Sequence, residues 1–307
     1  MEHSAFTPAF TCLLCDNKAF TKSMELSDYF LTQEKFTLYK CNACGLVHTT
    51  PVPSLSKLSD YYASEEYISH SGKKTNLIGK VYLRVRKYTH ARKYRLVNKH
   101  SRGRSILDIG CATGEFLNFC SARGMTVTGI EPNPKARNYA VSQYHLDVKD
   151  EQEIELLKSG SVDVITMWHV LEHVPDLNRR MMDLSRLLKE DGTAFIALPN
   201  HSSFDAKYYS EHWAAWDVPR HLFHFDRTSF RHLAEKHNFT VTDILPMRFD
   251  AFYVSMLSEK YRRGKSSVLN AVLVGLRSNL KAMTGRGEYS SLIYVIKKNG
   301  TIKSRTV

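Results

Sequence analysis

The stretch LDIGCATGEFL, residues 107–117, decides the fold of this chain. Its beginning completes a short apolar strand, RSILDIG, and its end starts a helix that Gly124 closes. Between strand and helix, Gly110 and Gly114 let the backbone approach a ligand closely, and the first N–H groups of the helix face that ligand. The sequence therefore predicts a ligand-binding turn where a strand passes into a helix.

From this turn toward the C-terminus, strand and helix patterns alternate. The expected strands are TVTGIEP, SVDVITMWHV, TAFIALPN, FTVTDIL and SLIYVIKK, and the expected helices are NPKARNYAVSQ, LNRRMMDLSRLLKEDG and TSFRHLAEKHN. The second of these helices carries one apolar face, made of Leu177, Met181, Leu184 and Leu188. Strands alternating with helices of this length indicate βαβ units, and hence an α/β fold with a doubly wound, mostly parallel sheet.

An acidic residue, Glu131, stands 23 residues after Asp108, at the end of the next expected strand. In dinucleotide-binding folds a carboxylate at this place accepts both hydroxyls of a ribose. The turn lacks the G-x-G-x-x-G spacing, which disfavours a dinucleotide pyrophosphate as the ligand. The alternative to a nucleoside ligand is an empty structural turn.

The same segments resemble class I S-adenosylmethionine-dependent methyltransferases. LDIGCATGEFL resembles their motif I and GIEPNP their acidic second motif. The resemblance continues through DVITMWHVLEHVPD, LPN and HLFHFDRTSFRHLAEKHNF, over residues 105–245. It is strongest to the branch that includes ubiquinone-biosynthesis O-methyltransferases and many sugar or antibiotic methyltransferases. It implies a seven-stranded Rossmann-like sheet and S-adenosylmethionine as cofactor, although Ala112 stands where many members have glycine.

The resemblance also implies which residues bind the cofactor. Residues of the turn line its methionine and ribose portion, Glu131 accepts the ribose hydroxyls, and the residues after it flank the adenine. The full expected set is Asp108, Gly110, Cys111, Ala112, Gly114, Glu131, Pro132, Asn133, Met167, Trp168 and His169. Trp168 either stacks on the cofactor or fills the core, and His173 either makes a structural hydrogen bond or takes part in catalysis. Asp147 is a candidate for the acid on the adenine side.

Two cysteine pairs near the N-terminus have the spacing of a metal site. Cys12 and Cys15 form one C-x-x-C pair and Cys41 and Cys44 form another, with 25 residues between the pairs. Four thiolates can surround Zn²⁺ tetrahedrally, and a closed four-cysteine shell makes the metal structural rather than catalytic. The alternative is a redox dithiol. We expect a small zinc ribbon over residues 1–50.

The segment 199–226 follows the carboxyl end of an expected strand, where open α/β sheets bind their ligands. It is long and rich in His, Trp and Tyr, so we expect a substrate lid. The rival interpretation packs these aromatic residues against the basic helix as plain core. His221 and His224 are the candidate general bases, because imidazole removes a proton near neutral pH. For each of them a structural role is the alternative.

The charge of the chain, +12 over 307 residues, is concentrated in two flanks. Residues 73–104 hold twelve Lys or Arg and no acid, and residues 260–307 hold eleven against Glu288 alone. These flanks are either solvated helix faces or an anion-facing surface. No apolar run approaches the roughly 18–20 residues of a membrane span, and the first residues show no secretory signal. We expect a cytoplasmic protein with reduced cysteines.

These patterns predict a chain of three parts. They are the ribbon at 1–50, a linker with a basic amphipathic helix at 51–104, and a methyltransferase domain at 105–307. The leading functional interpretation is O- or C-methylation of a small-molecule acceptor such as a sugar or an isoprenoid. One alternative is an rRNA or tRNA methyltransferase that grips phosphates with the ribbon and the basic flanks. The ribbon's excess of acidic residues disfavours it. A non-catalytic binding module is the other alternative.

Overall fold

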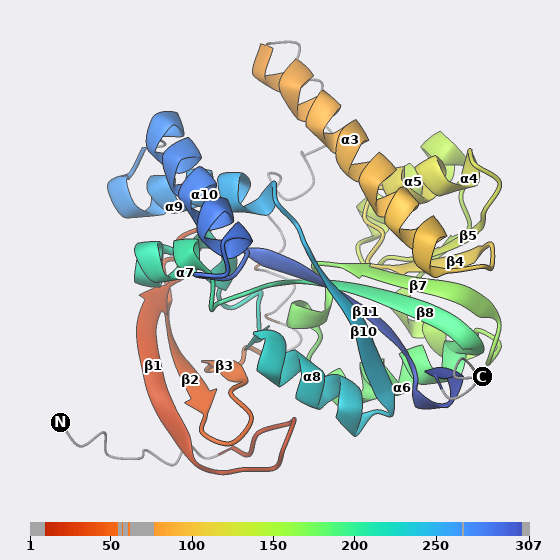
Figure 1. Ribbon diagram of the computed structural model, residues 1–307, viewed down its shortest axis with the longest axis horizontal. Helices are drawn as coiled ribbons and strands as arrows, with labels where there is room; N and C mark the ends of the chain where they lie inside the picture. Colours follow the sequence, from red (N-terminus) through yellow and green to blue (C-terminus); the bar gives the residue numbers. More distant parts are fainter. Residues whose placement is uncertain (1–9, 55–56, 58–60, 62–76, 266, 303–307) are drawn as a thin grey trace. The chain divides into compact units, whose positions relative to one another are not determined.

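The computed structural model describes residues 10–54, 57, 61, 77–265 and 267–302, without the side chains of 77–83 and 301–302. The chain divides into two compact units (Figure 1). The first unit comprises Met1–Ala63, Leu171–Arg180 and Ala197–Tyr294. The second unit comprises Ser64–Val170, Met181–Ile196 and Val295–Val307.

A seven-stranded sheet has the strand order β10-β11-β8-β7-β4-β5-β6. Its strands are β4 (Ser105–Ile109), β5 (Thr126–Ile130), β6 (Val148–Lys149), β7 (Val162–Trp168), β8 (Leu188–Pro199), β10 (Phe239–Pro246) and β11 (Ser291–Lys298). β4 pairs in parallel with both β5 and β7, and β5 pairs in parallel with β6. The expected α/β fold with a mostly parallel seven-stranded sheet is confirmed.

The four expected helices are present between these strands. They are α4 (Glu115–Ser121), α5 (Pro134–Tyr144), α6 (Leu177–Leu187) and α8 (Arg227–Lys236). Two short 3-10 helices, η3 (Glu151–Leu156) and η4 (Leu171–His173), lie in the same part of the chain. α5 begins at Asn133, whose side chain accepts hydrogen bonds from the backbone N–H groups of Lys135 and Ala136, and this satisfies donors that the first turn leaves unpaired. The basic helix expected within residues 51–104 is α3 (Leu77–His100). The part of the expected linker at residues 62–76 lies outside the described residues.

Helix α6 ends earlier than the sequence predicts. The expected helix runs to Gly192, but β8 already begins at Leu188. The backbone N–H groups of Gly160 and Ser161 donate to the carbonyls of Arg186 and Leu187 at 2.8 and 3.0 Å. Because these carbonyls are bonded to another segment, the helical hydrogen-bond ladder stops there.

The first unit contains a second sheet, with the order β1-β2-β3-β9. Its strands are β1 (Phe20–Ser27), β2 (Lys35–Cys41), β3 (Val47–Thr50) and β9 (Phe223–His224). Each strand pairs antiparallel with the next. Three strands therefore come from the expected ribbon, and the fourth comes from the segment 199–226.

The ribbon's sheet packs on the segment 199–226 and on two helices that the sequence analysis did not predict. That segment includes α7 (Phe204–Tyr209), η5 (Ser210–His212) and η6 (Ala214–Trp216), and the two helices are α9 (Asp250–Arg263) and α10 (Val268–Met283). One hydrophobic cluster joins these elements, and it includes Leu26, Phe36, Leu38, Val47, Trp213, Trp216, Val254 and Val274. A small sheet cannot cover its own apolar face, so the ribbon gains most of its core from residues far along the chain.

Candidate functional site

The glycine turn of the second unit lies between β4 and α4, as the sequence predicts (Figure 1). Gly110 and Gly114 have φ angles of 72° and 75°, which glycine adopts without a steric cost. A Cβ atom on Gly110 would lie 2.5 Å from a methyl group of Val170, and one on Gly114 would lie 2.8 Å from the Cβ of Ala140. Ala112 also has a positive φ, of 49°. The turn thus depends on both glycines, and Ala112 occupies a strained position between them.

Glu131 follows β5 and is held by the backbone on two sides. The backbone N–H groups of Ala112 and Asn133 each donate to one of its carboxylate oxygens at 2.8 Å. Burial raises the pKa of Glu131, and these two N–H groups oppose that rise. A carboxylate has about four acceptor positions, so two remain for other donors. The geometry fits the recognition of two neighbouring hydroxyl groups.

Asp108 lies at the end of β4 and is almost completely buried. The hydroxyl of Thr166, on β7, donates to its carboxylate at 2.5 Å. Burial raises the pKa of Asp108 to about 7, although Thr166 and the ammonium of Lys93 both lower it. Neither Thr166 nor Lys93 was among the expected site residues, although Thr166 directly precedes Met167, which was.

The segment Met167–His169 ends β7 beside this turn. Met167 is fully buried, and His169 has a positive φ of 59°. The ring of Trp168 packs edge-on against Phe116, and the ammonium of Lys93 lies 4.2 Å from the centre of the indole. Within the described residues the indole N–H, although buried, has no hydrogen-bond partner. A buried donor of this kind is suited to a ligand.

The four cysteines of the ribbon come together in the first unit. The Sγ atoms of Cys12 and Cys44 are 3.5 Å apart, as are those of Cys15 and Cys41, and all four lie within 4.8 Å of one another. Tetrahedral zinc–sulfur bonds of about 2.3 Å place the sulfurs about 3.8 Å apart. All four are free thiols, and a hydrogen bond from Cys44 lowers the pKa of Cys12 to about 3. The donor set fits a closed zinc site.

The two candidate bases have different surroundings. The Nε2 atom of His224 lies 2.9 Å from the hydroxyl of Thr49, and that hydroxyl donates to the carbonyl of His221 at 2.7 Å. Because the hydroxyl proton is used there, Nε2 of His224 must be the donor to Thr49. Burial and the neighbouring histidines hold the pKa of His224 well below its usual range. His224 therefore joins β9 to β3 as a neutral side chain.

His221 carries its proton on Nδ1, whereas His224 carries it on Nε2. The Nδ1 of His221 lies 2.9 Å from the carbonyl of Ala215, so Nδ1 carries the proton and Nε2 has the lone pair. That Nε2 is 3.9 Å from a carboxylate oxygen of Glu172 and 4.0 Å from one of Asp217. The lone pair of this Nε2 therefore lies close to two carboxylates.

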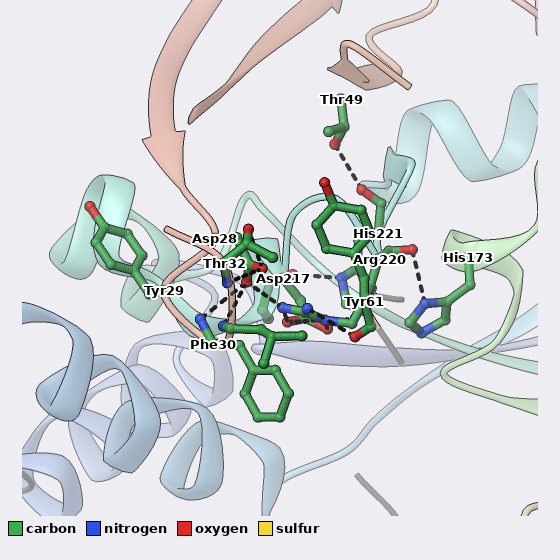
Figure 2. A network of polar contacts seen from close by, with 12 residues as sticks. Asp28, Tyr29, Phe30, Thr32, Thr49, Tyr61, His173, Asp217, Arg220 and His221 are labelled. Carbon is green, nitrogen blue, oxygen red and sulfur yellow. Dashed lines mark hydrogen bonds and ion pairs between the residues drawn. The ribbon is translucent and has the colours of Figure 1, made fainter. Parts of the chain in front are cut away.

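His173 lies beside His221, with ring centres 4.5 Å apart (Figure 2). Its Nδ1 is 3.0 Å from the carbonyl of Arg220, and burial lowers its pKa to about 4. Ligand atoms of Glu172, His173 and His221 lie within 4.8 Å of one another, so this cluster is the second group in the described residues with donors for a metal ion. Glu172 was not among the expected residues, although its place directly before His173 could have indicated it.

Arg220 connects the ribbon to this cluster, and sequence reasoning missed it (Figure 2). Its guanidinium donates to Asp28 at 2.8 Å and to Asp217 at 2.7 Å, and only 1% of its side chain is exposed. Burial would raise the pKa of Asp217, but Arg220 holds it below its usual value. The same guanidinium lies 4.7 Å from the centre of the Phe30 ring. A buried arginine between two carboxylates fixes both chain segments in one geometry.

Comparisons with known proteins bear on the family of this chain. A family model described as a methyltransferase domain matches residues 82–244. The ubiquinone biosynthesis O-methyltransferase of Coxiella burnetii is 32% identical over 116 residues, which is 36% of this chain and 49% of the relative. That of Glaesserella parasuis is 34% identical over 113 residues, covering 33% of this chain and 48% of the relative. The chain thus matches about half the length of these relatives.

Solved structures show the same fold at low sequence identity. The chain is similar to a SAM-dependent methyltransferase from Thermotoga maritima, with a TM-score of 0.52, 15% identity, and 79% of this chain and 99% of that chain covered. It is also similar to the magnesium protoporphyrin IX methyltransferase of Synechocystis, with a TM-score of 0.52, 13% identity, and 80% and 100% covered. The family model spans more than half of the residues, and the chain therefore belongs to the class I S-adenosylmethionine-dependent methyltransferases.

Proposed function

We propose that this protein transfers a methyl group from S-adenosylmethionine to an oxygen or carbon atom of a small-molecule acceptor, such as a sugar or an isoprenoid. The observation that carries the proposal is the carboxylate of Glu131, held by the N–H groups of Ala112 and Asn133 at the edge of the glycine turn. Its remaining acceptor positions suit the two ribose hydroxyls of the donor. The expected cofactor-binding set, from Asp108 to His169, belongs to this proposal.

The relatives' names favour a metabolite over a nucleic acid. Ubiquinone biosynthesis and magnesium protoporphyrin IX name small-molecule acceptors of those proteins. For the alternative of an rRNA or tRNA acceptor, the ribbon would have to hold phosphates, yet residues 1–50 contain four lysines against five acids. Methyl transfer to extracted metabolites, but not to extracted RNA, is the outcome that this proposal expects.

S-adenosylmethionine supplies an electrophilic methyl group, and the chain supplies orientation and a base. We assign the base to His221 rather than to His224. The Nε2 of His221 is unprotonated in the neutral ring and lies near Glu172 and Asp217. An acceptor hydroxyl would lose its proton to this nitrogen as its oxygen takes the methyl group. The Nε2 of His224 already donates to Thr49.

Residues 199–226 belong to the acceptor side in this proposal. Tyr209, Trp213 and Trp216 are at most 4% exposed and form part of the first unit's core. Such burial favours a fixed wall over a mobile lid. The hollow beside Arg220, lined by Tyr29, Trp213 and Asp217 among others, has room for about one water molecule and is too small for a metabolite. We do not assign the acceptor to it.

We further propose that the four ribbon cysteines hold one structural Zn²⁺ per chain, in a compartment that keeps thiols reduced, as the cytoplasm does. Elemental analysis of the purified protein should find about one zinc. Cys41→Ser should lose the metal and lower the melting temperature. Cys120→Ser, at a buried thiol outside the cluster, is the control that should keep the zinc. A protein without zinc, or one with a disulfide within a cysteine pair, would contradict the proposal.

The function is tested by calorimetry with S-adenosylmethionine and by transfer of its labelled methyl group to metabolite extracts. Both His221→Gln and His224→Gln should bind the donor as the unchanged protein does. His221→Gln should slow transfer about 10²–10⁴-fold. His224→Gln should lower the melting temperature and reduce transfer only as far as the protein unfolds. Absence of donor binding would refute the function, whereas equal transfer by the two variants would refute only the choice of base.

A further inference from the structure

Helices α9 and α10 form a hairpin between β10 and β11 (Figure 1). The face of α10 that packs on the protein is made of small residues, two of them polar. Its buried residues are Ala271, Val274, Gly275, Ser278 and Asn279. Ser278 donates to the carboxylate of Asp205 at 2.7 Å, and Asn279 donates to the carbonyl of Arg248 at 2.9 Å. A Cβ on Gly275 would lie 2.7 Å from the ring of Phe252, so the two helices approach closely there.

The outward face of α10 is the apolar one. Seven side chains on it are 40–74% exposed, namely Val268, Leu269, Val272, Leu273, Leu276, Leu280 and Met283. Their spacing of three and four residues, with two adjacent pairs, makes one continuous stripe along the helix. On α9, Tyr253 and Met256 are exposed too. The large apolar side chains of α10 therefore point away from the protein, and the smaller residues pack on it. A contiguous exposed apolar patch of this kind marks an interaction surface.

The charges around this stripe have one sign. Between Lys260 and Arg286 the chain has seven Lys or Arg and no Asp or Glu. Lys260, Lys265, Arg277 and Arg286 are exposed. The nearest acid before this stretch, Glu259, is fully buried and pairs with Arg262 and Arg263 at 3.1 Å. The partner of this surface must therefore be apolar and carry negative charge.

We propose that the α9–α10 hairpin docks on the surface of a bilayer that contains anionic lipids. The apolar stripe of α10 would enter the boundary of the acyl chains, and the surrounding cations would contact the lipid phosphates. A second copy of this chain is disfavoured, because a two-fold axis through the stripe would bring these cations face to face. Within the described residues no helix is long and apolar enough to cross a membrane. In this proposal the hairpin binds to the bilayer surface without spanning it.

This inference goes beyond methyl transfer and does not depend on it. Its test uses the full chain and sedimentation with vesicles of phosphatidylcholine alone or mixed with phosphatidylglycerol. We expect binding to the mixed vesicles, weaker binding to phosphatidylcholine, and release at high salt. Leu273→Asp should lower the partition coefficient about tenfold or more, since it places a charge in the stripe. Leu156→Asp, at a leucine that is 82% exposed in η3, is the matched control and should bind as the unchanged protein does.

Both leucines are exposed, so neither change should alter the melting temperature, and a loss of binding by Leu273→Asp would not reflect unfolding. Lys265→Glu should weaken binding to the mixed vesicles about fivefold or more at low salt. Failure of the unchanged protein to bind mixed vesicles would overturn the proposal, as would equal binding by Leu273→Asp. A dimer that Leu273→Asp converts to a monomer in light scattering would assign the face to self-association instead.

Discussion

The glycine turn of the second unit and the cluster around Arg220 and His221 in the first unit are built from the chain in opposite ways. In the turn, Glu131 is held by backbone groups that are two and nineteen residues away in the sequence. In the cluster around Arg220 and His221, Arg220 binds Asp28 across 192 residues, and Thr49 binds the carbonyl of His221 across 172. One site is the product of a single strand–helix–strand unit, whereas the other exists only when distant segments have packed together.

The two regions differ in the groups that fix the position of their key residues, which are backbone groups in one and side chains in the other. Backbone N–H groups hold Glu131, so side-chain changes near it leave its position intact. Side chains hold His221 and its neighbours through a buried ion pair, and the loss of one partner leaves charges without compensation. The turn should therefore tolerate substitution around the carboxylate, and the cluster around Arg220 and His221 should be sensitive to the loss of any one side chain that holds it.

The largest expected effect is at Arg220. Arg220→Ala removes the cation between Asp28 and Asp217, and should lower the free energy of unfolding by about 3–5 kcal/mol. Denaturant unfolding measures this change. Arg277→Ala, at an exposed arginine of the same unit, should stay within about 0.5 kcal/mol. A loss at Arg220 no greater than at Arg277 would show that the ion pair does not hold the two segments together.

A pH-dependent effect is expected at Asp108, whose pKa burial raises to about 7 from an ordinary value of 3.8. Between these values the folded state keeps a proton that the unfolded state has lost. The contribution of Asp108 to stability is therefore complete below about pH 4 and is lost as the pH rises toward 7. The change amounts to a few kcal/mol at most.

Asp108→Asn removes this titration while keeping an oxygen that can accept from Thr166. Unfolding curves of both proteins between pH 4 and 8 should show the unchanged protein losing stability relative to the variant as the pH rises. Parallel curves would mean that the Asp108 carboxyl titrates alike in the folded and unfolded states.

A smaller effect, confined to donor binding, is expected at Glu131. Glu131→Ala removes a charged acceptor for two hydroxyl groups and should weaken S-adenosylmethionine binding by about 1.5–3 kcal/mol. Glu131→Gln keeps one acceptor oxygen and should lose less. Calorimetry with the donor and with its demethylated product should show the same order for both ligands. Unchanged affinity in Glu131→Ala would move the ribose contact to another residue.

The helical hairpin shows why part of the fold escaped prediction. From the sequence alone, the leucines of this helix would be predicted to face the core. In the structure Ser278 and Asn279 are buried and Leu273 is exposed. The orientation of the helix depends on residues elsewhere in the chain. Asp205 accepts a hydrogen bond from Ser278, and the carbonyl of Arg248 accepts one from Asn279. The early end of α6 also depends on a distant segment, because the N–H groups of Gly160 and Ser161 donate to the last carbonyls of the helix.

By itself the sequence determined the order of strands and helices, the glycine turn, the place of Glu131 and the cysteine spacing. Each of these follows from residues close together along the chain, whose steric and hydrogen-bonding preferences act before the chain has packed. Only the tertiary structure decided that β9 completes the ribbon's sheet, that Arg220 joins Asp28 to Asp217, and that His221 and His224 present opposite ring nitrogens. These features depend on which distant groups meet in a buried, low-dielectric interior, where each polar atom must find a partner.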